Sequence, residues 1–172
     1  MNKLLLISLA LVGCAQQNDM IQDTSIFTGI DPIIQTYFDR FTYETGVSTA
    51  GITAGFTTLS NNIAGLCAID GPYREIRLDQ TNYNNIMSSD LEVEQLVFHE
   101  LGHCALFLMH INNCITNGVL TDPADAQQQS CPGQPQSIMN WQSFNPNQIT
   151  FYSDVTQHAY YIHALTVNQP IP

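Results

Sequence analysis

The sequence contains 172 residues, of which 44% are apolar and 11% are charged, and this composition fits one domain with its own core. Fifteen acidic residues stand against four basic ones, so the formal net charge is −11 at pH 7. Such a surface repels nucleic acid and anionic lipid headgroups, so neither is an expected partner.

The first 13 residues have the pattern of a secretory signal. Lys3 gives a positive start, and the apolar run 4–13 is too short to span a bilayer. The run ends in Leu11-Val12-Gly13-Cys14. This pattern resembles the lipobox of bacterial lipoproteins, in which the signal is cut before the cysteine and the thiol carries lipid. An ordinary signal peptide with an incidental cysteine is the alternative.

The lipobox resemblance implies a protein anchored in a bacterial cell envelope through lipid on Cys14, facing the periplasm or the exterior. Ala15 after the cysteine favours the outer membrane, by analogy with Gram-negative sorting. We therefore divide the chain into a signal peptide (1–13), a polar lipidated tether (14–28) and a folded domain (29–172). We expect the folded domain to be a monomer.

The first predicted element of the domain is a helix. Asp31-Pro32 supplies an N-cap followed by proline at the first helical position, and Gly46 ends the helix. Its apolar residues recur at helical spacing: Ile33, Ile34, Tyr37, Phe38 and Phe41.

A strand is predicted over 52–59, followed by a hairpin whose strands, 63–69 and 73–78, flank Asp70-Gly71. A second helix begins near Ser89, which stands at capping-box spacing from Glu92. Residues 111–136 are rich in polar residues, glycine and proline and are predicted to be loop. A last helix is predicted from Pro146 to about Leu165. This order of elements predicts an α+β domain.

Four cysteines remain after Cys14, and an even number in an exported chain suggests two disulfides with three alternative pairings. A zinc site built from four cysteines would need paired C-x-x-C spacings, which are absent. Position along the chain favours the pairs Cys67–Cys104 and Cys114–Cys131.

The motif His99-Glu100-Leu101-Gly102-His103 is the strongest indication of chemistry. Residues four apart on a helix lie on one face, so the two imidazoles can bind one ion. Neutral imidazole nitrogen is a preferred ligand of Zn²⁺, and Glu100 can act as general base toward a water at the metal. A helix with two surface histidines and a solvated glutamate is the alternative. The motif lies in an otherwise apolar helix, where unpartnered polar groups would be costly, and this favours the metal site.

A catalytic zinc site needs a third protein ligand. No glutamate follows Glu100, which excludes an arrangement with a downstream glutamate ligand. We favour His110 as the ligand. In an unbroken helix it would lie about 10.5 Å along the axis from His103, so the chain must leave the helix near 106–108 and fold back. The other downstream candidates are Asp122, Asp125, Asp154, His158 and His163; we interpret the two histidines as packing or surface residues.

The run from His99 to His110, followed by Ser137-Ile138-Met139-Asn140, resembles the metzincin clan of zinc peptidases, which includes the matrix metalloproteinases. The clan motif is H-E-x-x-H-x-x-G-x-x-H, and a later S-x-M segment, the Met-turn, places a methionine under the metal. By this resemblance Met139 is that methionine. Leu106 stands at the clan's glycine position, and Met109 stands at its third-histidine position, so His110 comes one residue later.

Small bacterial lipoprotein peptidases similar to matrixins show the same later spacing, with a cysteine directly after the second histidine. The resemblance therefore implies a Cys67–Cys104 disulfide, a Zn²⁺ cofactor, and a peptide or protein substrate. It also places residues 73–78 near the edge strand that pairs with an extended substrate. Trp141 stands where the clan often has tyrosine, so a tyrosine-type oxyanion donor is not expected there.

Sequence alone thus predicts a small α+β, metzincin-like zinc endopeptidase with Glu100 as its general base. Two alternatives stay open. One is a catalytically inactive zincin-fold lipoprotein that serves as a binding module. The other is a structural lipoprotein in which the motif arises by chance.

Overall fold

The computed structural model describes residues 25–59, 63–85, 89–110, 114–116, 119–121, 134–135, 137–139 and 154–167. The signal, Cys14 and most of the predicted tether lie outside these ranges. The domain division and the lipid anchor therefore stay predictions.

The first helix is confirmed as α1 (Pro32–Thr45). The Asp31 side chain accepts a hydrogen bond from the backbone N–H of Ile33, which caps the start of the helix. Gly46 ends the helix in the left-handed conformation at φ 71°, a conformation that glycine adopts without a steric penalty. The apolar face of α1 buries Ile34, Tyr37, Phe38 and Phe41.

The strand and the hairpin are also confirmed, as β1 (Ile52–Thr57), β2 (Gly65–Asp70) and β3 (Tyr73–Asp79). The sheet order is β1-β3-β2, with β3 parallel to β1 and antiparallel to β2. Residues 29–31 hydrogen-bond to Ala54 along the outer side of β1. Residues 73–78 are thus the central strand, and the edge position beside them belongs to β2, which no other described strand pairs on its outer side.

A short helix, α2 (Gln80–Asn85), follows β3 directly and was not predicted. The helix that carries the histidine motif is α3 (Asp90–Leu106). Its predicted capping box is confirmed, because the Ser89 hydroxyl accepts from the Glu92 amide while the Glu92 carboxylate accepts from the Ser89 amide.

The predicted loop over 111–136 is wrong in part. The described residues there form a second small sheet of β4 (Cys114–Thr116), β5 (Val119–Thr121) and β6 (Gln134–Pro135), in the order β5-β4-β6. The β4 and β5 sequences are rich in β-branched residues, and Asn117-Gly118 between them is typical of a two-residue hairpin turn. The segment as a whole is rich in polar residues, glycine and proline, so its composition favoured a loop over this short hairpin.

The last helix starts later than predicted. It is α5 (Val155–Val167), and the Asp154 carboxylate accepts a hydrogen bond from the Gln157 amide at its first turn. An aspartate in this position satisfies a backbone donor that the helix leaves open, which accounts for the start of α5 at Val155. Pro146 itself, like the residues from 140 to 153, lies outside the described ranges.

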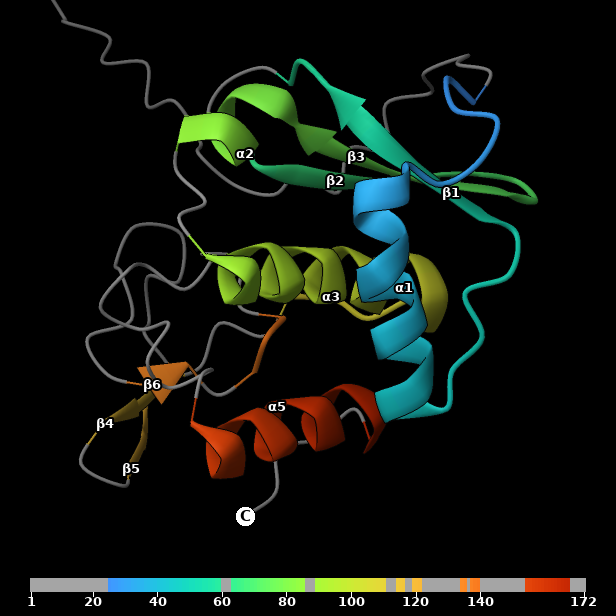
Figure 1. The fold of residues 1–172 in the computed structure, drawn as a ribbon. Helices are drawn as coiled ribbons and strands as arrows, with labels where there is room; N and C mark the ends of the chain where they lie inside the picture. Colours follow the sequence, from blue (N-terminus) through green and yellow to red (C-terminus); the bar gives the residue numbers. More distant parts are fainter. Residues whose placement is uncertain are drawn as a thin grey trace, which may run out of the picture.

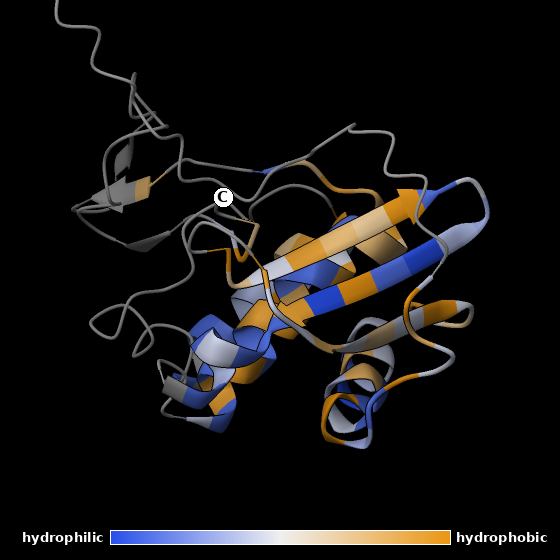
Figure 2. Cartoon of the chain, turned by 90° about the horizontal axis from the view of Figure 1, so that it is seen from above, coloured by the Kyte–Doolittle hydropathy of each residue, from blue (hydrophilic) through white to orange (hydrophobic). Residues whose placement is uncertain are grey.

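The described elements form layers, and the α+β fold class is confirmed. The three-stranded sheet lies over α3, α5 lies on the other side of α3, and α1 crosses beside both (Figure 1). Hydrophilic and hydrophobic residues alternate along β3, whereas β2 is hydrophobic over most of its length (Figure 2), and Ile76 and Leu78 of β3 are buried in the core. The core joins all layers; for example, the rings of Phe41 in α1 and Phe98 in α3 meet edge to face at 5.2 Å.

A disulfide between Cys67 in β2 and Cys104 in α3 confirms the first predicted pairing. It fixes the edge strand to the helix one residue after the second histidine of the motif. Cys114 is also disulfide-bonded, whereas Cys131 lies outside the described residues, so the second pairing stays a prediction.

Replacing both Cys67 and Cys104 with alanine is expected to lower the free energy of unfolding by about 3–4 kcal/mol. The bond closes a loop with a sequence separation of 37, and its removal returns conformational entropy to the unfolded chain. Equilibrium urea unfolding measures the change, with the exposed substitution Tyr43→Ala as a control. An unchanged transition midpoint in the double variant would contradict the stabilising role of the bond.

Candidate metal centre

Two buried histidines of α3 lie one turn apart, and each has one ring nitrogen fixed by a backbone carbonyl. His99 Nδ1 lies 2.7 Å from the Ile138 oxygen, and His103 Nδ1 lies 2.7 Å from the Leu108 oxygen. A carbonyl oxygen can only accept, so both Nδ1 atoms must carry the proton. The Nε2 atom of each neutral ring therefore presents a lone pair.

These lone pairs point toward each other. His99 Nε2 and His103 Nε2 are 3.2 Å apart, yet neither carries a proton to share in a hydrogen bond. Two ligand atoms on one tetrahedral zinc, each bonded at about 2.0–2.1 Å, would stand about 3.3 Å apart. The pair therefore has the spacing and the protonation state that a shared cation requires.

His110 completes the group because the chain turns back after α3, as predicted. The turn is made at Phe107, which has a left-handed backbone at φ 56°. The amides of Phe107 and Leu108 donate to the carbonyls of His103 and Gly102. His110 Nε2 then lies 3.0 Å from His103 Nε2, and ligand atoms of all three histidines fall within 4.8 Å of one another. The three side chains are close enough to hold one metal ion.

The surroundings keep the three imidazoles neutral. Burial above all, with smaller contributions from His103 and His110, lowers the pKa of His99 from 6.5 to about 3, against the Ile138 carbonyl, which raises it. Burial also lowers the pKa of His103, partly offset by the Leu108 carbonyl. Burial together with His103 lowers the pKa of His110 to about 4. Neutral imidazole at pH 7 is the form that binds a metal.

Glu100, the predicted general base, is buried on the side of α3 that faces the sheet. Its carboxylate packs against Gly65 at the start of β2, where an added Cβ would lie 2.7 Å from Glu100 Oε1. Glycine at this position therefore leaves room for the carboxylate, and the edge strand and the acidic side chain are in direct contact.

Met139 packs against α3 at Gly102. Its sulfur fills the space over Gly102, and a Cβ at Gly102 would overlap that sulfur. The Met139 amide donates to the Ser137 hydroxyl, which shapes the short segment 137–139. Because this segment also supplies the Ile138 carbonyl to His99, the contact between Gly102 and Met139 sets the position of a group that orients a histidine.

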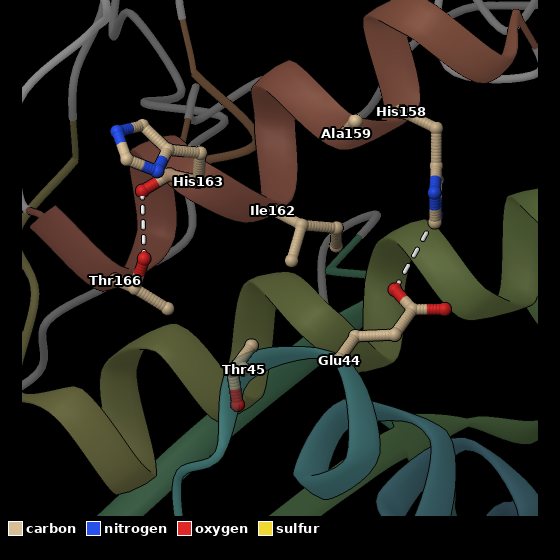
Figure 3. Close-up of a pocket in the computed structure, with 7 residues that line it drawn as sticks. All are labelled: Glu44, Thr45, His158, Ala159, Ile162, His163 and Thr166. Atoms are coloured by element: carbon tan, nitrogen blue, oxygen red, sulfur yellow. Dashed lines mark hydrogen bonds and ion pairs between the residues drawn. The ribbon is translucent and has the colours of Figure 1, made fainter.

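The other downstream candidates lie apart from the three histidines or outside the described residues. His158 Nε2 lies 3.0 Å from Glu94 and 3.8 Å from Glu44, and His163 is exposed. Both histidines line an open hollow of about 460 Å³ between α1 and α5 (Figure 3). Asp154 is exposed at the start of α5. Asp122, Asp125 and Trp141 are not among the described residues.

Sequence reasoning missed four groups at this site: the carbonyls of Leu108 and Ile138, and the two glycines, Gly65 and Gly102. Backbone carbonyls carry no sequence signal. The glycines could have been noticed as small residues beside the motif and in a strand, where glycine often marks a close approach.

No protein-family model, no curated protein and no solved structure matches this chain. Among the helices of the described residues, none has the length and apolar character needed to cross a bilayer.

The metal-free protein is expected to lose stability as the pH falls from 6.5 to 4.5. The pKa of His99 is lower in the folded state than its ordinary value of 6.5, so the unfolded chain binds more protons in this window and acid favours unfolding. The expected loss is on the order of 2 kcal/mol, measured by urea unfolding with chelator present at each pH. The exposed substitution His163→Ala should leave this loss unchanged, and a flat profile in the parent protein would contradict burial of neutral histidines.

The variant Gly102→Ala is expected to bind zinc about tenfold more weakly, because the new methyl group displaces Met139 and with it the Ile138 carbonyl. Competition against a chromogenic chelator measures the affinity. Gly29→Ala, where nothing lies within 4 Å of the added Cβ, is the matched control. In an ordinary helix interior, replacing glycine with alanine raises stability. If Gly102→Ala did only this and left zinc affinity unchanged, the link from Gly102 through Met139 to the Ile138 carbonyl would be refuted.

Proposed function

We propose that this chain is a zinc-dependent endopeptidase of the metzincin type. The observation that carries the proposal is the convergence of three neutral imidazole nitrogens beside a buried glutamate. Zinc suits the donor set, because it accepts neutral nitrogen ligands with tetrahedral geometry and leaves a fourth position for water. Glu100 directly after His99 and Met139 under the helix turn support the metzincin assignment, as does the cysteine bridge from β2.

In this proposal His99, His103 and His110 hold the ion, and the carbonyls of Ile138 and Leu108 fix two of the rings with Nε2 directed inward. Bound zinc would supply a Lewis acid that acidifies a water and polarises the scissile carbonyl. Glu100 takes the proton from the attacking water and later delivers it to the leaving amine. Its burial beside β2 keeps the carboxylate in one place during both transfers.

The substrate in this proposal is an extended peptide that adds to the outer side of β2. Main-chain hydrogen bonds along a strand edge recognise peptides with little regard for sequence, which fits a protein substrate. The edge strand contacts Glu100 through Gly65, so a peptide on this edge passes the acidic group.

We further propose that the protein acts at a bacterial cell envelope as a monomer anchored by lipid on Cys14. Residues 15–24 lie between that cysteine and the first described residue. Fully extended, this length reaches about 35 Å, so the domain would work close to the membrane surface.

The variant Glu100→Ala is expected to lose peptidase activity by at least about a thousandfold while it keeps one zinc per chain, because the carboxylate moves protons and is not a ligand. In contrast, His103→Ala should lose the metal, since two nitrogens hold zinc poorly. Peptide-library cleavage followed by mass spectrometry measures activity, and elemental analysis measures zinc.

Three results would separate the alternatives. Equal activity in Glu100→Ala would overturn the role of the base. Zinc-loaded parent protein that cleaves no peptide would favour the inactive binding module. Purified parent protein without zinc, whose melting does not respond to chelator, would favour a structural protein with a chance motif.

A further inference from the structure

The turn of the β2–β3 hairpin and the end of α3 lie at the same end of the domain (Figure 1). Ile69 and Arg74 stand directly opposite each other in the register of β2 and β3, so they share one face of the sheet. The Arg74 guanidinium lies 6.0 Å from the ring centre of Phe107. We call Ile69, Arg74 and Phe107 the hairpin-end platform.

Phe107 has a backbone conformation that is unfavourable for its residue type. Its backbone is left-handed, which costs a residue with a Cβ about 1–2 kcal/mol, and the residue is 65% exposed. Glycine or asparagine would make the same turn with less strain. A strained, exposed aromatic residue next to a candidate active site is best explained by use of its ring for binding.

Arg74 fixes the platform in place. It donates to the Cys104 carbonyl and to the Ala50 carbonyl, each at 3.1 Å, and its guanidinium lies over the Phe107 ring. These contacts hold the ring before any ligand arrives, which reduces the entropy lost on binding. Ile69, which is 48% exposed, adds apolar surface opposite Arg74 on the same face of the sheet.

The separation between the platform and Glu100 follows from the geometry of α3 and β2. The edge strand β2 and α3 run side by side in the same direction. Gly65 packs against Glu100, and Cys67 is disulfide-bonded to Cys104. From Glu100 to Phe107 the helix rises about 10.5 Å, and from Gly65 to Ile69 the strand advances about 13 Å. An extended peptide covers this distance with three or four residues.

The direction of the peptide follows from strand pairing. Antiparallel pairing is the more stable mode, and β2 already pairs with β3 in that way. A peptide antiparallel to β2 has its N-terminal part at the Ile69 end, over the platform. Its C-terminal part leaves past Gly65.

We propose that the hairpin-end platform is a specificity subsite that binds an apolar or aromatic side chain three or four residues N-terminal to the cleaved bond. This inference rests on the proposed peptidase function and deepens it. Phe107 supplies most of the contact area, Ile69 extends it, and Arg74 orients the ring. The rest of the substrate is held by its main chain along β2.

The test uses the zinc-loaded protein, a random peptide library and mass spectrometry of the products, which records the residues on both sides of every cut. Phe107→Asn removes the ring while it keeps a residue that tolerates the left-handed turn. Phe107→Tyr keeps the ring, and Tyr43→Asn removes another exposed aromatic residue, from α1. Zinc content is measured for every variant.

In the parent protein, the specificity constant is expected to be about tenfold higher for peptides with an apolar residue three or four positions before the cut than for peptides with glycine there. This preference should disappear in Phe107→Asn and persist in Phe107→Tyr and Tyr43→Asn. In Phe107→Asn, the ratio of the specificity constants for the apolar and the glycine-containing peptides should fall to about one, whatever the absolute rate.

The other outcomes refute the subsite. Three results would overturn the platform and leave the peptidase intact. The first is cleavage by the parent protein without this preference, and the second is a preference only for residues after the cut. The third is a fall in the cleavage of all peptides by the same factor in Phe107→Asn. Absence of any cleavage by the zinc-loaded parent protein would overturn the peptidase and the platform together.

Discussion

Two unprotonated nitrogens that face each other across 3.2 Å are the constraint on which the rest of the site depends. Backbone carbonyls occupy the opposite nitrogens of His99 and His103, so neither ring can turn its proton inward without losing a buried hydrogen bond. A cation between them converts this repulsion into attraction. The arrangement is thus costly in an ordinary core and favourable in a metal site.

Each layer of the fold contributes to that arrangement. The sheet and α5 enclose α3, which excludes water and keeps the imidazoles neutral. The turn at Phe107 brings His110 back and also presents the Leu108 carbonyl to His103. On the other side, Met139 packs on Gly102 and carries the Ile138 carbonyl to His99. A disulfide ties the edge strand to this helix, so the surface proposed for substrate and the histidines form one unit.

The parts of the fold that local signals determine could be predicted from the sequence. The caps of α1 and α3 and the β2–β3 hairpin were correct because the interactions involve residues a few positions apart. The return of His110 followed from two premises, that it is the third ligand and that an unbroken helix would carry it too far from His103. The carbonyls of Ile138 and Leu108 could not be predicted, because their roles depend on tertiary packing and any residue supplies the same group. The start of α5 at Val155 was missed, although Asp154 just before it is a residue type that caps helices.

Zinc-edge X-ray absorption on the purified protein tests the central claim most directly, because it counts and identifies the atoms bound to the metal. The account predicts three imidazole nitrogens and one oxygen at about 2.0–2.1 Å. A spectrum with sulfur ligands, or with fewer than three imidazoles, would contradict the site built from His99, His103 and His110.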